Sequence, residues 1–496
     1  MKTYLVQFAQ FHEEFRLAEF ESLKKLENIT VEYNPLEYKN NCPFLQIKVA
    51  SDEDASKLIR RAILIKAIYE LWGVGSNYQE VHESVKANPD RWPEYMEKSF
   101  KFTVHGFGKA CSSEQQLKII NSFSYLKFRG KIDLRNPDVE FAVIEDYGLQ
   151  TERDFDVLDP HTIYMGRLIA SGNRELIAKF NVKKRRYIGN TTMDAELSLI
   201  MANQALASPG KLIYDPFVGT GSFLFTCAHF GAFTMGSDID GRQIRGREDR
   251  GVRDNISQYQ INGKVLDTLV FDLCHHPWRE VPIFDGIVTA PYGVRAGAKK
   301  LGRKIPLKKP VQTEPAFPGD IPMHLREEYY PPTQPWEMSE VLKHLLEFAA
   351  KFLKVGGRLV YWLPTLPEEY TPEDVPLHPS MRLVANSEQS FGKWARRLIT
   401  MEKVCPYIKP QSQCDLEQYK AASDKAEIDI TDKIDALSLG EEQAAKTPGH
   451  YAFREKGIEK RVEVTDELCG KCKLKILVLF DVIEKELEGS LLIISG

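Results

Sequence analysis

The chain has 496 residues, of which 43% are hydrophobic and 27% charged, and its net charge is −4. At about 100–200 residues per domain, this length predicts two or three domains of an ordinary globular protein. No run approaches the ~18 apolar residues of a membrane span, and the slightly acidic balance confines any nucleic-acid site to a local basic patch.

Eight cysteines are scattered along the chain without the density of a disulfide scaffold. The start is unlike a signal peptide, because charged residues soon follow its short apolar stretch. Both features favour a reducing compartment, so we expect the protein in the cytoplasm. Cys469 and Cys472 could supply half of a zinc site, but no second pair at finger spacing accompanies them, and no metal site is predicted.

Residues 1–155 are predicted to form a small α+β domain. Strands are expected over 3–10, 44–49, 101–105 and 139–145, and helices over 13–26 and 113–126. A further helix is predicted from Asp52 to Trp72, with Leu58, Ala62, Ile65 and Tyr69 on its apolar stripe, ended by Gly73. Acidic residues gather near 150–160, where we place the domain boundary, followed by a linker over 156–180.

From 181 to 404, strands alternate with long helices, which is typical of a parallel sheet covered on both faces. Candidate strands are 211–215, 232–238, 267–272, 284–289 and 357–363, with a helix over 338–354 and a final hairpin of 381–390 and 396–404. The Pro- and Lys-rich stretch between Gly293 and Trp336 is expected to order only on substrate. The charged segment 405–496 is predicted to be a loosely ordered tail.

A glycine-rich turn is the sharpest motif. Asp215-Pro216-Phe217-Val218-Gly219-Thr220-Gly221 lies between an apolar strand and a helix. Glycines at such a turn let a ligand approach the backbone, and the helix start offers N–H donors. A P-loop lysine and the dinucleotide G-x-G-x-x-G are both absent, which disfavours a phosphate ligand. We predict that Asp215, Phe217, Gly219, Thr220 and Gly221 bind a cofactor.

Acidic residues follow the next two strands at the same edge. Either Asp238 or Asp240 could accept hydrogen bonds from ribose hydroxyls, and we favour Asp238 because it comes first. Asp272 is placed for the amino group of an adenine. A single such carboxylate caps a helix about as often as it binds a ligand, but three at successive strand ends favour a binding site.

The fourth strand ends in Thr289-Ala290-Pro291-Tyr292-Gly293. This segment resembles the D/N-P-P-Y/F motif of amino-methyltransferases. Together with D-P-F-V-G-T-G, the run Lys184–Met193, Val355–Pro364 and Arg396–Lys403, it resembles the THUMP-containing tRNA guanosine-10 N2-methyltransferases over roughly residues 1–456.

The resemblance implies a fold, a reaction and partners. It implies a Rossmann-like class I methyltransferase domain with a mixed seven-stranded sheet, preceded by an α+β ferredoxin-like and THUMP-type RNA-binding domain. The cofactor would be S-adenosylmethionine, and the reaction N2-methylation of guanosine 10 in tRNA. The family also works with a small zinc-binding activator subunit that covers an apolar edge of the catalytic domain.

The motif departs from the family at its decisive position. An exocyclic amine is a poor nucleophile, and the motif's acidic or amide side chain accepts its N–H bonds while Tyr292 stacks on the flipped base. Here no Asp or Asn is present, and the motif is one residue shorter than T-D-P-P-Y. Thr289 is the candidate substitute, and a hydroxyl is the weaker acceptor. We therefore predict slow or absent methylation.

A basic cluster precedes the methyltransferase domain. Lys183, Lys184, Arg185, Arg186 and Tyr187 are predicted to contact RNA, as is a second set in the long loop that begins with Arg295. The alternative for both is solvated surface charge.

Two other functions compete with this interpretation. One is a catalytically inactive tRNA-binding paralogue. The other is an amino-methyltransferase that acts on adenine in DNA, which the N-terminal domain argues against.

Overall fold

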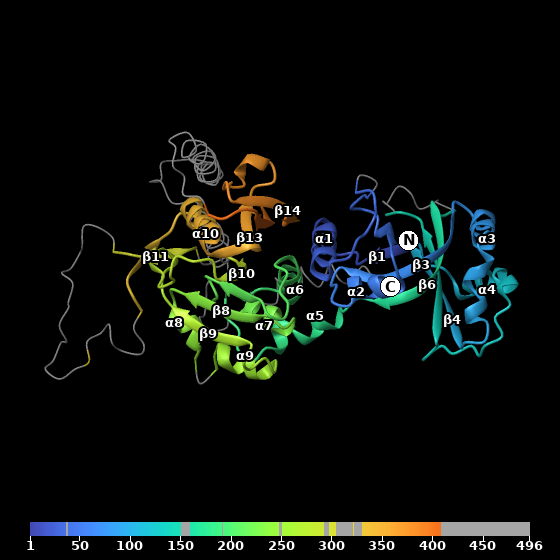
Figure 1. Cartoon of the computed structure of the whole chain (residues 1–496), viewed down its shortest axis with the longest axis horizontal. Helices are drawn as coiled ribbons and strands as arrows, with labels where there is room; N and C mark the ends of the chain where they lie inside the picture. Colours follow the sequence, from blue (N-terminus) through green and yellow to red (C-terminus); the bar gives the residue numbers. More distant parts are fainter. Residues whose placement is uncertain are drawn as a thin grey trace, which may run out of the picture.

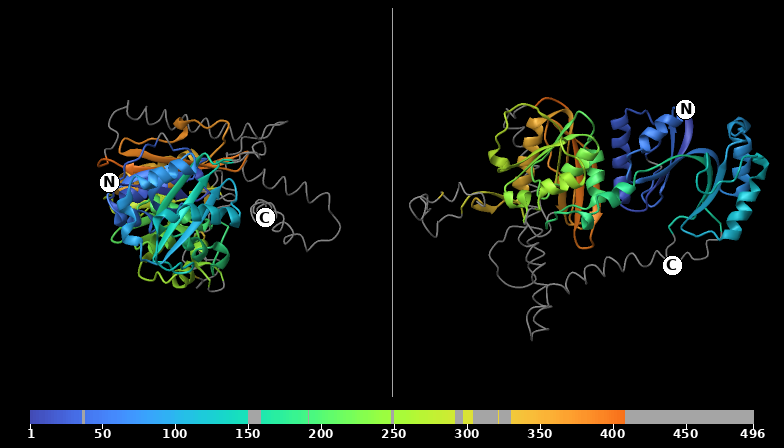
Figure 2. Two further views of the ribbon diagram at one scale, coloured as in Figure 1. Left: turned by 90° about the vertical axis from the view of Figure 1, so that its right-hand side faces the viewer. Right: turned by 90° about the horizontal axis from the view of Figure 1, so that it is seen from below.

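Two domains lie side by side in the computed structural model, each built on its own sheet (Figures 1 and 2). The structure describes residues 1–35, 38–149, 159–190, 192–247, 250–291, 297–303, 321 and 330–407. Within these ranges, no helix is both long and apolar enough to cross a membrane. The predicted tail beyond 407, with its Cys469 and Cys472, lies outside the described residues.

The N-terminal domain has a six-stranded sheet in the order β2-β1-β3-β6-β5-β4. Strands β4 and β5 are parallel to each other, and the other neighbouring strands described are antiparallel. Its strands are β1 (Lys2–Phe8), β2 (Phe44–Val49), β3 (Ile65–Gly75), β4 (Phe100–Phe107), β5 (Val139–Asp146) and β6 (Thr162–Ser171). The helices are α1 (Arg16–Glu27), α2 (Asp52–Ile59), α3 (Tyr78–Lys86) and α4 (Ser113–Ser122). The α+β architecture predicted for this region is confirmed.

The prediction of one long helix from Asp52 to Trp72 is wrong for the second half of this segment. Helix α2 ends at Ile59, and Ile65–Gly75 form β3, which pairs with β1 on one side and β6 on the other. A strand inside a sheet is buried on both faces, so its apolar residues run almost without interruption. Such a run matches helical spacing as well as it matches a strand.

The predicted domain boundary is also too early. Residues 162–171, expected in the linker, form β6 in the middle of the first sheet, and Glu175–Lys179 form the short helix α5. The N-terminal sheet therefore draws on chain beyond residue 155.

The second domain confirms the mixed seven-stranded sheet, in the order β14-β15-β13-β10-β7-β8-β9. The strands are β7 (Leu212–Asp215), β8 (Phe233–Asp238), β9 (Val265–Val270), β10 (Phe284–Thr289), β13 (Leu353–Thr365), β14 (Met381–Ser390) and β15 (Ala395–Lys403). The first five are parallel, and β15 runs antiparallel to both β13 and β14. Its helices are α6 (Ala195–Gln204), α7 (Ser222–His229), α8 (Gly241–Arg245), α9 (Val252–Gln258) and α10 (Met338–Phe352).

Helices cover both faces of this sheet, which explains its apolar strands. Along β13, Val360 and Trp362 pack into the cluster that contains α6 and α7, whereas Leu359 and Tyr361 pack into the cluster that contains α10. Parallel strands placed side by side bring their carboxyl ends to one edge. That edge carries the glycine turn and the acidic residues singled out above.

A short two-stranded ribbon follows β10 at this edge. It pairs β11 (Lys299–Leu301) with β12 (Thr333–Pro335) in antiparallel fashion. The ordering of the intervening loop on substrate stays a prediction, because most of that loop lies outside the described residues.

The two domains share a buried interface. Ile63 and Leu64 of the N-terminal domain pack into the same apolar cluster as α6. Asn203 of α6 donates to Glu19 at 2.6 Å and accepts from the guanidinium of Arg61 at 2.8 Å. Glu19 also accepts from the backbone N–H groups of Ile63 and Leu64. These bonds satisfy charges that burial would otherwise make costly, so they tie the domains together.

Candidate active site

The glycine turn joins β7 to α7 and adopts backbone angles that favour glycine. Gly219 and Gly221 have φ values of 50° and 85°, in the left-handed region. Val218 packs against β8, where a Cβ at Gly236 would come within 2.5 Å of its side chain. The turn therefore lies close against the neighbouring strand, at the carboxyl end of β7.

Asp238 holds this turn in place. Its carboxylate accepts hydrogen bonds from the backbone N–H of Gly219 and of Asp240, each at 2.8 Å. Burial raises the pKa of Asp238 to about 6, although these bonds oppose the shift. A carboxylate accepts about four hydrogen bonds, so Asp238 retains capacity for a ribose hydroxyl.

Asp240, the other ribose candidate, caps the next helix. It accepts from the backbone N–H of Arg242 and forms an ion pair with the Arg242 guanidinium at 2.7 Å. The pairing holds the pKa of Asp240 below its ordinary value despite partial burial. Its carboxylate thus has fewer open acceptor positions than that of Asp238.

Asp272 is buried and anchors the ribbon. It accepts hydrogen bonds from the backbone N–H of Cys274 and of Leu301, at 3.1 and 2.9 Å, and lies 3.2 Å from a ring nitrogen of His275. The predicted adenine contact therefore shares its carboxylate with β11. This bond fixes the start of the loop that follows the catalytic strand against the end of β9.

Asp215 and Thr289 meet at the centre of the site. The Thr289 hydroxyl donates to Oδ1 of Asp215 at 2.8 Å, and the backbone N–H of Phe217 donates to the same oxygen at 3.0 Å. No described group donates to Oδ2, although it is buried. Burial raises the pKa of Asp215 to about 7, and the two bonds oppose that shift. A buried acceptor without a partner suits a positively charged ligand group.

The interpretation of Thr289 as a substitute for the missing acid is corrected by this geometry. Its side chain is fully buried and its hydroxyl is committed to Asp215. Thr289 is the last residue of β10, and its hydroxyl is directed toward Asp215. Ala290 is half-buried and Pro291 is buried, whereas Tyr292 lies outside the described residues.

The remaining turn residues contact two different parts of the chain. Phe217 packs against the cluster of α10, 6.3 Å from the ring of Trp336. The Thr220 hydroxyl lies 2.9 Å from that of Thr192, and the backbone N–H of Met193 donates to Ser222 at 3.2 Å. The segment before α6 therefore covers the glycine turn. In the sequence, this segment carries no signal for such a contact beyond its part in the family resemblance.

The first basic cluster is divided between surface and core. Lys183, Lys184 and Arg186 are exposed, as an RNA contact requires. Arg185 is a correction, because it is 6% exposed and its guanidinium donates to Ser222 and to the Tyr259 hydroxyl. The other members of the predicted set differ in position: Tyr187 is half-buried with its hydroxyl bonded to Gln243, and Arg295 lies outside the described residues.

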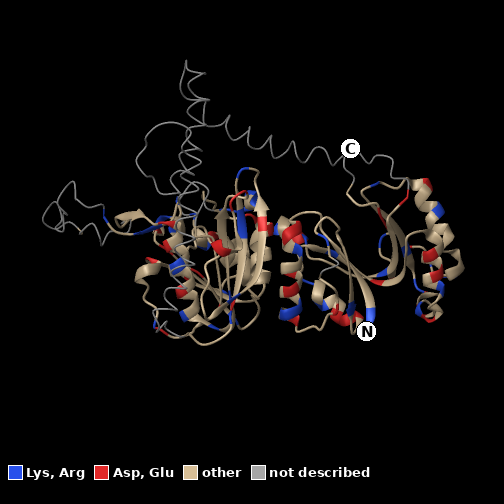
Figure 3. Cartoon of the chain, turned by 90° about the horizontal axis from the view of Figure 1, so that it is seen from above, with Lys and Arg blue, Asp and Glu red and all other residues tan. Residues whose placement is uncertain are grey.

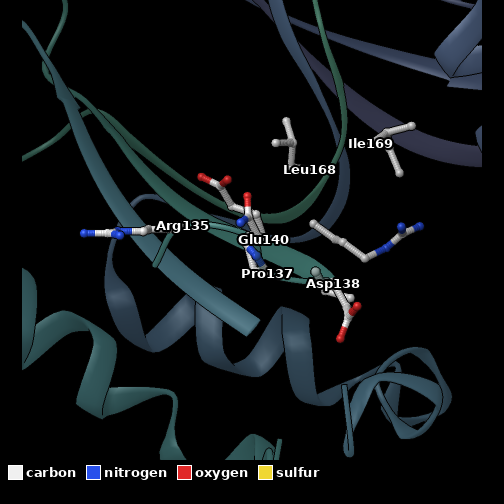
Figure 4. A pocket seen from close by; sticks show the side chains of 9 residues that line it. Arg135, Pro137, Asp138, Glu140, Leu168 and Ile169 are labelled. Carbon is white, nitrogen blue, oxygen red and sulfur yellow. The ribbon is translucent and has the colours of Figure 1, made fainter. Parts of the chain in front are cut away.

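Charges of both signs are interspersed over the described surface (Figure 3). No group of three or more metal-ligating side chains occurs in the described ranges. A cavity of about 450 Å³ lies in the N-terminal domain, between β6 and the chain before β5 (Figure 4). Its lining includes Arg135, Asp138, Glu140 and Arg167. It is separate from the glycine turn, since its lining comes from the N-terminal domain alone.

Comparison with known proteins identifies the family. Residues 2–174 match the family described as the Tmrp11 THUMP N-terminal domain, which also places β6 in the first domain. The chain is 37% identical to the tRNA (guanine(10)-N(2))-methyltransferase of Schizosaccharomyces pombe, over 92% of this chain and 96% of that one. It is 39% identical to the human tRNA (guanine(10)-N(2))-methyltransferase TRMT11, over 82% of this chain and 89% of that one. The chain belongs to the tRNA (guanine(10)-N(2))-methyltransferase family.

Proposed function

We propose that this chain transfers a methyl group from S-adenosylmethionine to the N2 amine of guanosine 10 in tRNA. The observation that carries the proposal is the glycine turn after β7 with acidic residues at the ends of β7, β8 and β9, in a chain 37% identical to a methyltransferase of this specificity. The comparisons favour neither the inactive paralogue nor the adenine methyltransferase acting on DNA.

The residues at this edge fit the cofactor. S-adenosylmethionine carries a positively charged ammonium group, a ribose and an adenine, and when bound it supplies an electrophilic methyl group. The unpartnered Oδ2 of Asp215 suits the ammonium, Asp238 or Asp240 the ribose hydroxyls, and Asp272 the adenine amino group. Gly219, Gly221, Phe217 and Thr220 shape the turn against which such a ligand lies.

Catalysis by this chain is predicted to be slow. The end of β10 presents Ala290 and Pro291 in place of an acidic side chain, and Thr289 is turned toward Asp215. Among the described residues at this strand end there is no acidic or amide side chain, so backbone carbonyls are the acceptors proposed for the N–H bonds of guanine. Losing one charge-assisted acceptor at a reacting group costs on the order of 100-fold or more in rate.

The proposed tRNA contacts are Lys183, Lys184 and Arg186, together with Tyr292 and Arg295, which lie outside the described residues. The exposure of Lys183, Lys184 and Arg186 supports this assignment. Each phosphate contact adds salt dependence to binding.

The activator subunit of the family is proposed to bind the β9 edge of the second sheet. Among the described strands, β9 is the outer strand of the order and pairs with β8 alone. Leu266 and Val270 on this strand are 52% and 50% exposed. An exposed apolar edge strand is a ready template for another chain.

The cytoplasm is the proposed location, which the free cysteines among the described residues support.

The function is tested by transfer of labelled methyl from S-adenosylmethionine to unmodified tRNA in the presence of the activator. We expect label at guanosine 10. A tRNA with guanosine 10 replaced by adenosine is the control and is expected to stay unlabelled. Label at another nucleotide, or on DNA, would contradict the assigned specificity.

A further inference from the structure

The tip of the β14–β15 hairpin carries an aromatic pair beside two cations. Phe391 and Trp394 flank the turn Gly392-Lys393, with ring centroids 4.3 Å apart and an interplanar angle of 18°. The backbone N–H of Phe391 donates to the carbonyl of Trp394 at 2.8 Å, and Gly392 has a φ of 82°. The turn is therefore tight and holds the two rings in a stacked arrangement.

The pair continues inward as a series of planar groups. The guanidinium of Arg396 lies 5.5 Å from the Phe391 ring and 4.2 Å from the ring of Trp362, which is fully buried in the core. The same guanidinium is held by Gln389 at 2.8 Å. Trp362 and Arg396 thus fix the tip from beneath, while Phe391 is 45% exposed and Lys393 is exposed.

Strand register places this tip on the active-site edge. Tyr361 of β13 lies opposite Thr289, the last residue of the catalytic strand, and β13 continues to Thr365, opposite Ala395. At about 3.3 Å per residue, the tip stands roughly 13 Å beyond the end of the catalytic strand. That is the side on which substrate must approach.

A second set of contacts joins the tip to the cofactor turn. Arg396 lies 3.9 Å from the sulfur of Met193, and the backbone N–H of Met193 donates to Ser222 at the start of α7. Thr192, next to Met193, contacts Thr220 of the glycine turn. The tip is therefore connected to the glycine turn through Met193 and Thr192.

We propose that Phe391, with Trp394 behind it and Lys393 beside it, is a stacking platform for an unpaired base of the substrate tRNA that flanks the target nucleotide. The proposal rests on the proposed function, because it takes its occupant from that reaction. Bringing guanosine 10 to the end of β10 requires the base to leave its stack, which leaves its neighbours without a partner. An exposed aromatic face accepts any such base, and an adjacent ammonium pairs with its phosphate.

An alternative role for the rings is to stabilise the hairpin turn alone, as stacked aromatic pairs do. The two roles lead to different expectations for RNA binding. A turn-stabilising pair affects thermal unfolding and leaves tRNA affinity alone. A stacking platform affects tRNA affinity through the ring of Phe391, and it tolerates exchange of one aromatic for another.

The test is binding of unmodified tRNA to the full chain with its activator, measured over a range of salt concentrations. Phe391→Ala is expected to weaken binding about 5- to 150-fold, and Phe391→Trp to keep it within about threefold. The salt dependence of Phe391→Ala is expected to match that of the parent chain. Lys393→Gln is expected to lower the slope of log K against log salt by about 0.7 to 0.9.

Phe233→Ala is the matched control. Phe233 is 36% exposed at the start of β8, at the amino ends of the parallel strands and so opposite the active-site end. It is expected to leave tRNA affinity unchanged. Unaltered affinity in Phe391→Ala, with the parent chain binding tRNA, overturns the platform and leaves the proposed function standing. Absence of tRNA binding by the parent chain overturns both.

Discussion

Asp215 illustrates how a buried residue links stability to pH. Its carboxyl is fully enclosed, its pKa is raised from 3.8 to about 7 by burial, and one of its oxygens has no partner among the described residues. Because the folded chain holds this proton more tightly than the unfolded chain, the group favours folding below pH 4. That contribution is lost as pH rises from about 4 to 7.

Asp215→Asn is therefore expected to flatten the pH dependence of stability. An amide cannot ionise, so the cost of a buried charge at pH 8 disappears, while the hydrogen bond from Thr289 retains an acceptor. The measurement is the urea midpoint from pH 5 to pH 8, in the absence of cofactor. The parent chain should lose more stability over this range than the variant. If the urea midpoint changed with pH by the same amount in both proteins, a raised pKa of Asp215 would be excluded.

The sequence predicted where residues lie when a motif fixes the backbone, whereas their binding roles stay predictions. The glycine turn and the acids after β8 and β9 follow from local spacing, since parallel strands end at one edge. The sequence did not predict that Arg185 is buried while its basic neighbours are exposed, because a run of basic residues does not indicate which side chain points into the core. The contact between Asp215 and Thr289 joins residues 74 positions apart, and no local pattern encodes it.

At the scale of elements, one amide bridges α6 and the N-terminal domain, beside the apolar packing of Ile63 and Leu64. Asn203→Ala is expected to destabilise the chain by about 2 kcal/mol or more, because it leaves Glu19 and Arg61 buried with one partner fewer each. Urea denaturation followed by fluorescence measures the change. Asn121→Ala, at an exposed position in α4, is the control and should stay within about 0.5 kcal/mol. Equal midpoints for both variants would contradict a coupled interface.

The β9 edge gives a second prediction at this scale. Leu266→Asp is expected to abolish co-purification with the zinc-binding activator, because it replaces an apolar side chain that is 52% exposed on the edge strand with a charge. The melting temperature of the isolated chain should not change. Leu117→Asp, on the equally exposed surface of α4, serves as the control at 59% exposure and should retain the activator. Retention by Leu266→Asp would place the partner elsewhere.

Element prediction failed where burial overrides periodicity. The pattern of β3 fits a helix because a central strand is apolar on both faces, and only its pairing with β1 and β6 decides the matter. Strand β6 was assigned to a linker because the acidic stretch before it is typical of a boundary. Its partners β3 and β5 come from earlier in the chain, so its place in the first sheet is a long-range property.

At the scale of the whole molecule, the chain combines an intact family architecture with an altered catalytic end. Two domains share a buried interface, the cofactor edge keeps its turn and its acids, and the identity to family members extends over most of the chain. The catalytic end differs at Ala290, which stands where the family resemblance implies Asp-Pro. Folding and binding are therefore expected to be preserved while the rate of transfer falls.

The most direct test compares this chain with the variant Ala290→Asp-Pro in methyl transfer to unmodified tRNA, with the activator present and both proteins at equal tRNA occupancy. The account predicts label at guanosine 10 in both, with a single-turnover rate on the order of 100-fold higher in the restored variant. Equal rates for the two proteins would contradict it, since they would show that no acidic side chain is needed at the end of β10.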